Sequence, residues 1–338
     1  MKNAVLIMAG GSGSRLWPLT RRNNPKQSHR TFSQKSTFDY ILELASEIVP
    51  AELIFTTVGD SQLEYVRNSA VLNENIIHQH TNKNTAPAIL QSITCIMEKF
   101  GDCVISMIPS DHVITGGDML KEALRTSFDI AENTQDIIAI GTKPLFPSTG
   151  FGYIKFADNT GTIKKVLSFK EKPDQKTAVT YVDDGKHLWN TGIYICRAGR
   201  LLEEYEKHLP EMFKYRNDHR SLFNNAESMS FDKGIIEKTN RLQAVLSEHL
   251  WMDMGTYDFL DHYFKKDPDR NIIHGKGLLY ESENTSIISD RQMVVGFGIN
   301  DLLVVSTSDV VFVCEKKYIQ RIGDLFDKLL TDNGEKYL

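Results

Sequence analysis

The chain has 338 residues, a length that suits one large domain and one smaller domain. Its residues are 41% hydrophobic and 25% charged, which is ordinary for a soluble globular enzyme. Its formal net charge of −5 argues against nonspecific nucleic-acid binding, which requires a basic surface. We expect a cytoplasmic protein without membrane contact, because the four cysteines form no CxxC pair, no apolar run approaches the roughly 20 residues that span a bilayer, and the first strand begins too early for a signal peptide.

Short apolar runs alternate with longer amphipathic stretches in the first half of the chain. Apolar runs typical of buried strands lie at residues 4–9, 53–57, 103–108 and 137–141. Between them, residues 86–99 repeat their apolar side chains at helical spacing. This alternation predicts an α/β fold with a doubly wound, mainly parallel sheet, in which ligands bind at the carboxyl ends of the strands.

The second half is more mixed. Residues 151–156 and 162–169 alternate like paired strands across an Asp158-Asn159-Thr160-Gly161 turn. A further strand is expected at 188–196, and helices at 200–208 and 253–264. After the polar run 265–270 come four short β-rich pieces, at 277–281, 292–297, 302–306 and 310–314, and then a helical pattern from Ile319 to Leu329. We therefore expect a catalytic domain over residues 1–266 and a small β-rich tail over 271–338 that ends in a helix.

A glycine-rich loop directly follows the first predicted strand, reading Ala9-Gly10-Gly11-Ser12-Gly13-Ser14-Arg15. Glycines let the backbone turn tightly and bring its N–H groups against an anion, and Arg15 adds a forked cation suited to phosphate oxygens. The loop is neither a Walker A motif nor GxGxxG, and by itself it is equally compatible with an ordinary strand-to-helix turn. Lys26, in Pro25-Lys26-Gln27, could supply a second phosphate contact, although a surface lysine is more often simply solvated.

Two aspartates stand where Mg²⁺ ligands are often found. Asp111, in Pro109-Ser110-Asp111-His112, follows a buried strand, and Asp253 lies in the apolar stretch Leu250-Trp251-Met252-Asp253-Met254. Mg²⁺ typically takes one or two protein carboxylates together with phosphates and water, although either aspartate could equally cap a turn or helix. Glu171-Lys172-Pro173 and Trp189-Asn190-Thr191-Gly192 offer groups that could reach a phosphate or sugar hydroxyls, or could be surface turns.

These signals follow one another in an order that resembles the mannose-1-phosphate guanylyltransferase family of sugar nucleotidyltransferases, in its short monofunctional bacterial form. The resemblance runs from Met8 to about Leu330. Besides the segments quoted above, it rests on Leu16-Trp17-Pro18-Leu19, Asn84-Thr85-Ala86-Pro87-Ala88, Thr149-Gly150-Phe151-Gly152-Tyr153-Ile154 and Met254-Gly255.

The resemblance implies a Rossmann-like nucleotidyltransferase fold with a short β-helix-like tail. It implies that GTP and α-D-mannose 1-phosphate form GDP-mannose and diphosphate, by Mg²⁺-assisted in-line attack on the α-phosphorus. By motif position, the catalytic residues would be Arg15, Lys26, Asp111, Lys172 and Asp253, with Mg²⁺ held by Asp111 and Asp253. The nucleotide would be bound by Ala9, Gly10, Gly11, Gly13, Arg15, Lys26, Asn84, Thr85, Ser110 and Asp111. The sugar phosphate would be bound by Gly152, Glu171, Lys172 and Asn190.

Some positions depart from the family pattern. Ser28-His29-Arg30 follows Pro-Lys-Gln where Phe and Leu are usual, and Lys83 stands where arginine is usual before Asn-Thr-Ala-Pro. None of these changes removes a proposed catalytic group, but they leave the exact sugar open. Two alternatives therefore remain: a guanylyltransferase for another manno-configured sugar 1-phosphate, such as a heptose, and a regulatory subunit that binds a nucleotide sugar without making it. The apolar face of the last helix also allows a homodimer.

Overall fold

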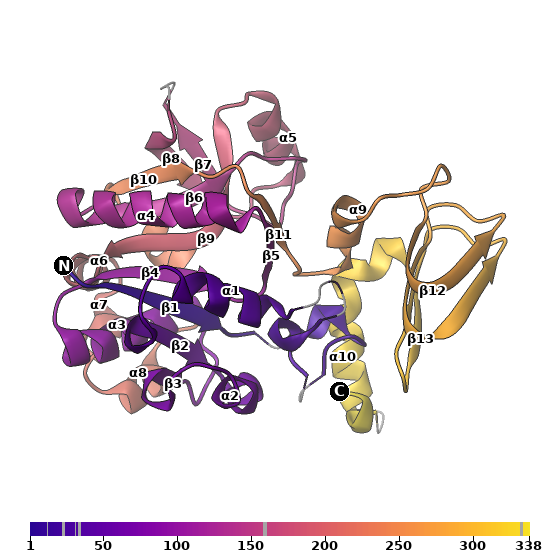
Figure 1. The fold of residues 1–338 in the computed structure, drawn as a ribbon, viewed down its shortest axis with the longest axis horizontal. Coiled ribbons are helices and arrows are strands. Elements are labelled where there is room, and N and C mark those ends of the chain that lie inside the picture. Colours follow the sequence, from indigo (N-terminus) through magenta and orange to yellow (C-terminus); the bar gives the residue numbers. More distant parts are fainter. Residues whose placement is uncertain (12, 22–23, 31, 33–34, 158–160, 332–333) are drawn as a thin grey trace. The chain divides into compact units, whose positions relative to one another are not determined.

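The computed structural model describes the chain except for residues 12, 22–23, 31, 33–34, 158–160 and 332–333 (Figure 1). The predicted turn at Asp158-Asn159-Thr160 therefore lies outside the described residues. Contacts divide the chain into two compact units, each built from separated segments. The first unit comprises Met1–Gly10, Asp39–Ser110 and Ile114–Trp251. The second unit comprises Gly11–Phe38, Asp111–Val113 and Met252–Leu338.

The first unit is built on a nine-stranded sheet in the order β3-β2-β1-β4-β9-β6-β10-β8-β7. Its strands are β1 (Asn3–Ala9), β2 (Ile54–Val58), β3 (Ile76–His78), β4 (Val104–Pro109), β6 (Ile137–Thr142), β7 (Tyr153–Phe156), β8 (Ile163–Lys170), β9 (His187–Arg197) and β10 (Leu242–Leu246). Strand β1 pairs in parallel with β2 and β4, and β2 with β3, whereas β9 runs antiparallel to β4 and β6. The predicted α/β sheet is confirmed, with its parallel pairs concentrated in the amino-terminal half.

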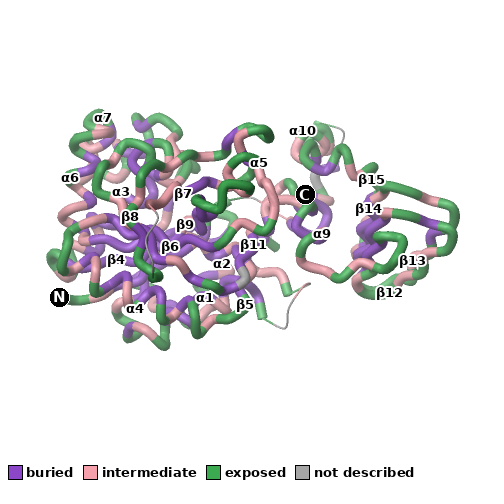
Figure 2. The backbone as a smooth tube through the Cα atoms, turned by 90° about the horizontal axis from the view of Figure 1, so that it is seen from above, coloured by how far each residue is buried: buried purple, intermediate pink, exposed green. Residues whose placement is uncertain are grey.

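Helices cover both faces of this sheet. They are α1 (Thr37–Ser46), α2 (Asp60–Arg67), α3 (Thr85–Phe100), α4 (Gly117–Thr134), α5 (Gln175–Asp183), α6 (Ala198–His208), α7 (Pro210–Phe213) and α8 (His219–Asn225). Figure 2 shows α3 and α6 on one side of the sheet and α4 on the other. The apolar stripe of α3, with Ile89, Ile93 and Ile96 almost fully buried, packs against Leu6 and Ile105 of the sheet. Each such side chain contributes roughly 1.5–3 kcal/mol by leaving water.

The second unit carries a four-stranded sheet of β12 (Ile272–Tyr280), β13 (Ser286–Phe297), β14 (Leu302–Ser306) and β15 (Val311–Glu315). The first three strands pair in parallel and β15 closes the sheet antiparallel to β14. The predicted β-rich tail is confirmed. It ends in the 3₁₀ helix Lys316–Arg321 and α10 (Ile322–Thr331), and Ile319 and Ile322 are buried in this unit's own core. That part of the apolar face of the last helix is therefore used within the chain.

The helix predicted over residues 253–264 is wrong in its first part, before Tyr257. Asp253 is instead the last residue of β11 (Leu250–Asp253), which pairs with β5 (His112–Thr115). Only the 3₁₀ turn Tyr257–Phe259 and α9 (Leu260–Tyr263) are helical. From Met252 to Met254 the partly exposed Asp253 stands between two buried methionines, as alternate residues of an extended chain do because they face opposite sides. No helix in the described part of the chain is long and apolar enough to cross a bilayer.

Candidate active site

The glycine-rich loop leaves β1 at the buried Ala9 and is shaped by two left-handed glycines. Gly11 has φ 92° and Gly13 has φ 67°, a region that side chains with a Cβ rarely adopt. A Cβ on Gly13 would lie 2.9 Å from the Cβ of Lys26, so this glycine lets the loop pack against the 3₁₀ helix Lys26–Ser28. Arg15 is exposed on the 3₁₀ helix Ser14–Leu16, where its guanidinium is open to an anionic ligand.

Three of the predicted catalytic residues meet in the second unit. The Lys26 ammonium donates hydrogen bonds to Asp111 Oδ2 and to Asp253 Oδ1, both at 2.9 Å. The Lys26 side chain is only 8% exposed, whereas the two aspartates are 26% and 31% exposed. The local fold explains the meeting: Asp111 immediately precedes β5 and Asp253 ends β11, and these two strands pair with each other. Residues far apart in the sequence thus place two carboxylates around one cation.

The charges of this cluster stabilise one another. Burial lowers the pKa of Lys26, but Asp111 and Asp253 outweigh that effect and raise it, so the ammonium stays charged. Burial likewise raises the pKa of Asp111, but Lys26 and His112 outweigh it and lower this pKa to about 2. Burial lowers the pKa of His112, which favours its neutral imidazole, and this ring lies 3.6 Å from Asp111 Oδ1.

The same cluster can hold a metal ion. Ligand atoms of Asp111, His112 and Asp253 lie within 4.8 Å of one another. Carboxylate oxygens are the ligands that hard divalent cations prefer, and these two already share a monovalent cation, the Lys26 ammonium. The donor set therefore fits a divalent ion, provided that the Lys26 ammonium moves off the carboxylates to make room for it.

A second polar cluster lies in the first unit and brings together three of the residues predicted to bind the sugar. A Cβ on Gly152 would lie 2.7 Å from Glu171 Oε2 and 3.3 Å from Asn190 Cβ, so the missing side chain leaves room beside both residues. The Glu171 side chain is 8% exposed, and burial followed by the charge of Asp232 raises its pKa. Lys172 lies beside it with Nζ 3.2 Å from Glu171 Oε1, but is 60% exposed and has φ 45°.

Sequence reasoning missed two residues of this cluster, Tyr194 and Asp232, which are joined to Asn190 by hydrogen bonds. Asn190 donates through Nδ2 to the Tyr194 hydroxyl at 2.7 Å and to Asp232 Oδ1 at 3.0 Å. Tyr194 in turn donates to Asp232 Oδ1 at 2.6 Å. In the sequence, nothing distinguishes Tyr194 from the other residues of the predicted strand 188–196. The signal that could have found Asp232 is an acidic residue beside the apolar Phe231, close to Ile235 and Ile236, where a buried or partly buried carboxylate needs donors.

The remaining predicted nucleotide ligands, Asn84, Thr85 and Ser110, have hydrogen-bond partners within the first unit. Asn84, at φ 70°, accepts a hydrogen bond from the Thr85 N–H, and the Thr85 hydroxyl accepts one from the Phe231 N–H. Ser110 is buried and donates to the Met8 carbonyl, which ties the ends of β1 and β4 together. Their roles at a nucleotide stay predictions.

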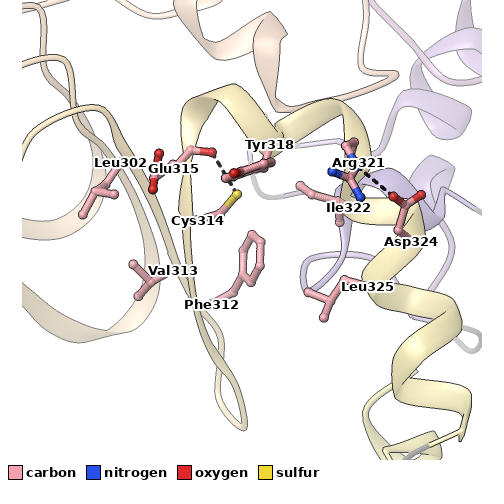
Figure 3. Close-up of a pocket in the computed structure, with 10 residues that line it drawn as sticks. All are labelled: Leu302, Phe312, Val313, Cys314, Glu315, Tyr318, Arg321, Ile322, Asp324 and Leu325. Atoms are coloured by element: carbon pink, nitrogen blue, oxygen red, sulfur yellow. Dashed lines mark hydrogen bonds and ion pairs between the residues drawn. The ribbon is translucent and has the colours of Figure 1, made fainter.

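A hollow of about 630 Å³ in the second unit contains none of the predicted site residues (Figure 3). Apolar side chains of β14, β15 and α10 form most of its wall, among them Phe312, Val313 and Leu325. Its charged groups are Arg321 and Asp324, which pair with each other at 2.9 Å, and Glu315, which pairs with Lys317. It therefore lacks the converging unpaired charges that phosphate binding needs.

Comparison with known proteins relates the chain to one group of enzymes. The Nucleotidyl transferase family model matches residues 4–269, and the MannoseP isomerase/GMP-like beta-helix domain matches residues 275–329. Mannose-1-phosphate guanylyltransferases from Sinorhizobium fredii and Klebsiella pneumoniae are each 29% identical to the chain. The first match covers 97% of this chain and 68% of the relative, and the second covers 98% of this chain and 75% of the relative. A crystal structure described as mannose-1-phosphate geranyltransferase from Thermus thermophilus is 26% identical, with a TM-score of 0.88 over 97% of this chain and 99% of that one.

Proposed function

The chain belongs to the nucleotidyl transferase family, and from this premise we propose that it converts GTP and α-D-mannose 1-phosphate into GDP-mannose and diphosphate. The relatives named mannose-1-phosphate guanylyltransferase support this choice of substrates, because they match the chain over nearly its whole length. The observation that carries the proposal is the Lys26 ammonium held between Asp111 and Asp253. This arrangement places a buried cation and two anionic oxygens beside the glycine-rich loop, which is of the kind that binds phosphates.

The reaction is a single in-line displacement. A phosphate oxygen of the sugar 1-phosphate bonds to the α-phosphorus of GTP, and the bond from that phosphorus to the bridging oxygen of diphosphate breaks. The attacking phosphate is already an anion, so no residue has to remove a proton from it. Catalysis then consists of positioning the reactants and neutralising charge that develops on the phosphates.

The chain's own residues divide this work. The N–H groups of Gly10, Gly11 and Gly13 line the triphosphate, and Arg15 adds a forked cation to it. Lys26, once released from its carboxylates, neutralises the charge of the departing diphosphate. Lys172 orients the phosphate of the sugar. When bound at Asp111 and Asp253, Mg²⁺ supplies further neutralisation of the α-phosphate charge.

An assay of four nucleoside triphosphates against several sugar 1-phosphates tests this proposal. We expect pyrophosphate release to be fastest with GTP and mannose 1-phosphate and to require Mg²⁺. Faster release with a heptose 1-phosphate would select the alternative sugar, which the unusual Ser28-His29 keeps open. Binding of GDP-mannose without any release would select the regulatory subunit.

We further propose that residues 1–266 form the catalytic domain and 271–338 the tail domain, in line with the ranges of the two family matches. A cytoplasmic location, a homodimer, and the lack of nucleic-acid and membrane partners stay predictions. Sedimentation of the purified chain tests the homodimer directly.

A further inference from the structure

The hydrogen bonds of Asn190 limit what this side chain can offer a ligand. Its amide nitrogen carries two hydrogens, and both are taken, by the Tyr194 hydroxyl at 2.7 Å and by Asp232 Oδ1 at 3.0 Å. Its amide oxygen already accepts a hydrogen bond from the Gly192 N–H at 3.1 Å. Asn190 therefore has no hydrogen left to donate to a sugar, and can offer only the second lone pair of its oxygen.

Asp232, by contrast, has one carboxylate oxygen available to accept a hydrogen bond from a ligand. Its Oδ1 accepts from both Asn190 and Tyr194, whereas no residue in the described part of the chain donates to its Oδ2. The side chain is neither fully buried nor fully exposed, so a ligand can reach it. Asp232 is also the first residue of the π-helix Asp232–Ile236, a rare backbone form that is frequently found at functional sites.

The surroundings of Asp232 are rich in hydrogen-bond acceptors. Its charge acts on Glu171, whose carboxylate stands beside the space left by Gly152. The nearby cation, Lys172, is paired with Glu171 and is mostly exposed. Asp232 Oδ2 and the Glu171 carboxylate, which is paired with a mostly exposed lysine, suit a ligand that brings its own hydrogens, as the hydroxyl groups of a sugar do.

We propose that Asp232 is a sugar-binding and specificity-determining residue: its Oδ2 accepts a hydrogen bond from a hydroxyl of the sugar 1-phosphate, while its Oδ1 holds Asn190 and Tyr194 in place. Asn190 is then a positioning residue for this carboxylate. The inference rests on the proposed function, because it assumes that the first unit binds the sugar of that reaction.

Asp232→Asn is the sharpest variant for the test. The amide has the size of the carboxylate, and its oxygen can still accept from Asn190 and Tyr194, so the internal network is kept. The other oxygen becomes an NH₂ group, which presents hydrogens to the sugar hydroxyl in place of an acceptor. Glu227→Gln is the matched control, because it makes the same chemical change at an exposed position five residues earlier in the chain.

We expect Asp232→Asn to raise the KM for mannose 1-phosphate by roughly 10- to 100-fold, the usual effect of losing a hydrogen bond to a charged group, while the KM for GTP stays within about twofold. A set of monodeoxy mannose 1-phosphates identifies the hydroxyl. One analogue should be a poor substrate of the wild type yet be used equally well by wild type and Asp232→Asn, because neither can form the bond. Should Asp232→Asn fail to fold, Tyr194→Phe removes one donor from Oδ1 and should raise the same KM by a smaller factor.

The possible outcomes distinguish failure of the role of Asp232 from failure of the proposed function. Wild-type turnover together with an unchanged sugar KM in Asp232→Asn, as in Glu227→Gln, would overturn the role of Asp232 alone. An equal rise in both KM values with a lowered Tm would also overturn it, because that pattern marks a structural residue. If the wild type neither turned over any sugar 1-phosphate nor bound GDP-mannose, the proposed function would fall, and this inference with it.

Discussion

Replacing Lys26 with methionine removes the cation between Asp111 and Asp253 while keeping a side chain of similar length. In the wild type the ammonium bonds both carboxylates at 2.9 Å. Ligand atoms of the two carboxylates lie within 4.8 Å of each other in the wild type, and Lys26→Met leaves no ammonium between them. The variant thus leaves two anions without a cation, and a divalent ion no longer has to displace one.

The size of the effect follows from these distances. Two unit charges at 4.8 Å repel each other by about 3 kcal/mol at an effective dielectric constant of about 20. Because Asp111 and Asp253 are 26% and 31% exposed, solvent reduces this cost, and we expect the free energy of unfolding to fall by about 1–3 kcal/mol without metal. For a chain of this size that corresponds to a Tm lowered by roughly 2–6 °C.

The assay is thermal unfolding of wild type, Lys26→Met and the exposed control Lys276→Met, each in EDTA and in excess Mg²⁺. We expect Mg²⁺ to restore most of the stability that Lys26→Met loses, and to bind this variant roughly tenfold more tightly than the wild type in calorimetry without GTP. Turnover should nevertheless fall by roughly 10²- to 10³-fold, because the diphosphate loses a cation. An equal loss of Tm in EDTA and in Mg²⁺, or a weaker metal affinity in the variant, would refute this reasoning.

Three further predictions concern single positions. Asp111→Ala and Asp253→Ala should each abolish pyrophosphate release while far-UV circular dichroism stays native, and loss of the fold in both would remove the argument for a catalytic role. Gly152→Ala should raise the KM for the sugar phosphate at least tenfold, because the new Cβ would lie 2.7 Å from Glu171 Oε2 and 2.9 Å from Phe169 Cζ; an unchanged KM would show that this space is not used. The pKa of Asp111, about 2 against an ordinary 3.8, means that its charge stabilises the fold fully above about pH 4 and that this contribution is lost as the pH falls toward 2. Denaturant titrations should therefore show about 2 kcal/mol more loss over this range in wild type than in Asp111→Asn, and parallel curves would contradict the assignment.

The sheet was largely predictable because its signal is local. Apolar runs mark β1, β2, β4 and β6, and helical periodicity marks α3, whose Ile89, Ile93 and Ile96 are buried as the spacing requires. The two compact units were not predictable in this way. Each joins segments that are far apart in the sequence, and such long-range contacts leave no periodic pattern in either segment.

The candidate site was likewise predictable only where the signal is local. Motif position selects Lys26, Asp111 and Asp253 one at a time, but their meeting depends on the pairing of β5 with β11, which replaces the predicted helix at Asp253. Asp232 was missed because its partners lie 42 and 38 residues away, at Asn190 and Tyr194. The apolar neighbours Phe231, Ile235 and Ile236 mark Asp232 as a carboxylate that needs donors, but no local pattern shows which residues supply them.

Pyrophosphate release by the purified wild-type chain, measured with GTP and mannose 1-phosphate in the presence and absence of Mg²⁺, tests the central claim most directly. The account predicts Mg²⁺-dependent release together with GDP-mannose, identified by mass spectrometry as the second product. Binding of GDP-mannose with no release from any pair of triphosphate and sugar 1-phosphate would contradict it.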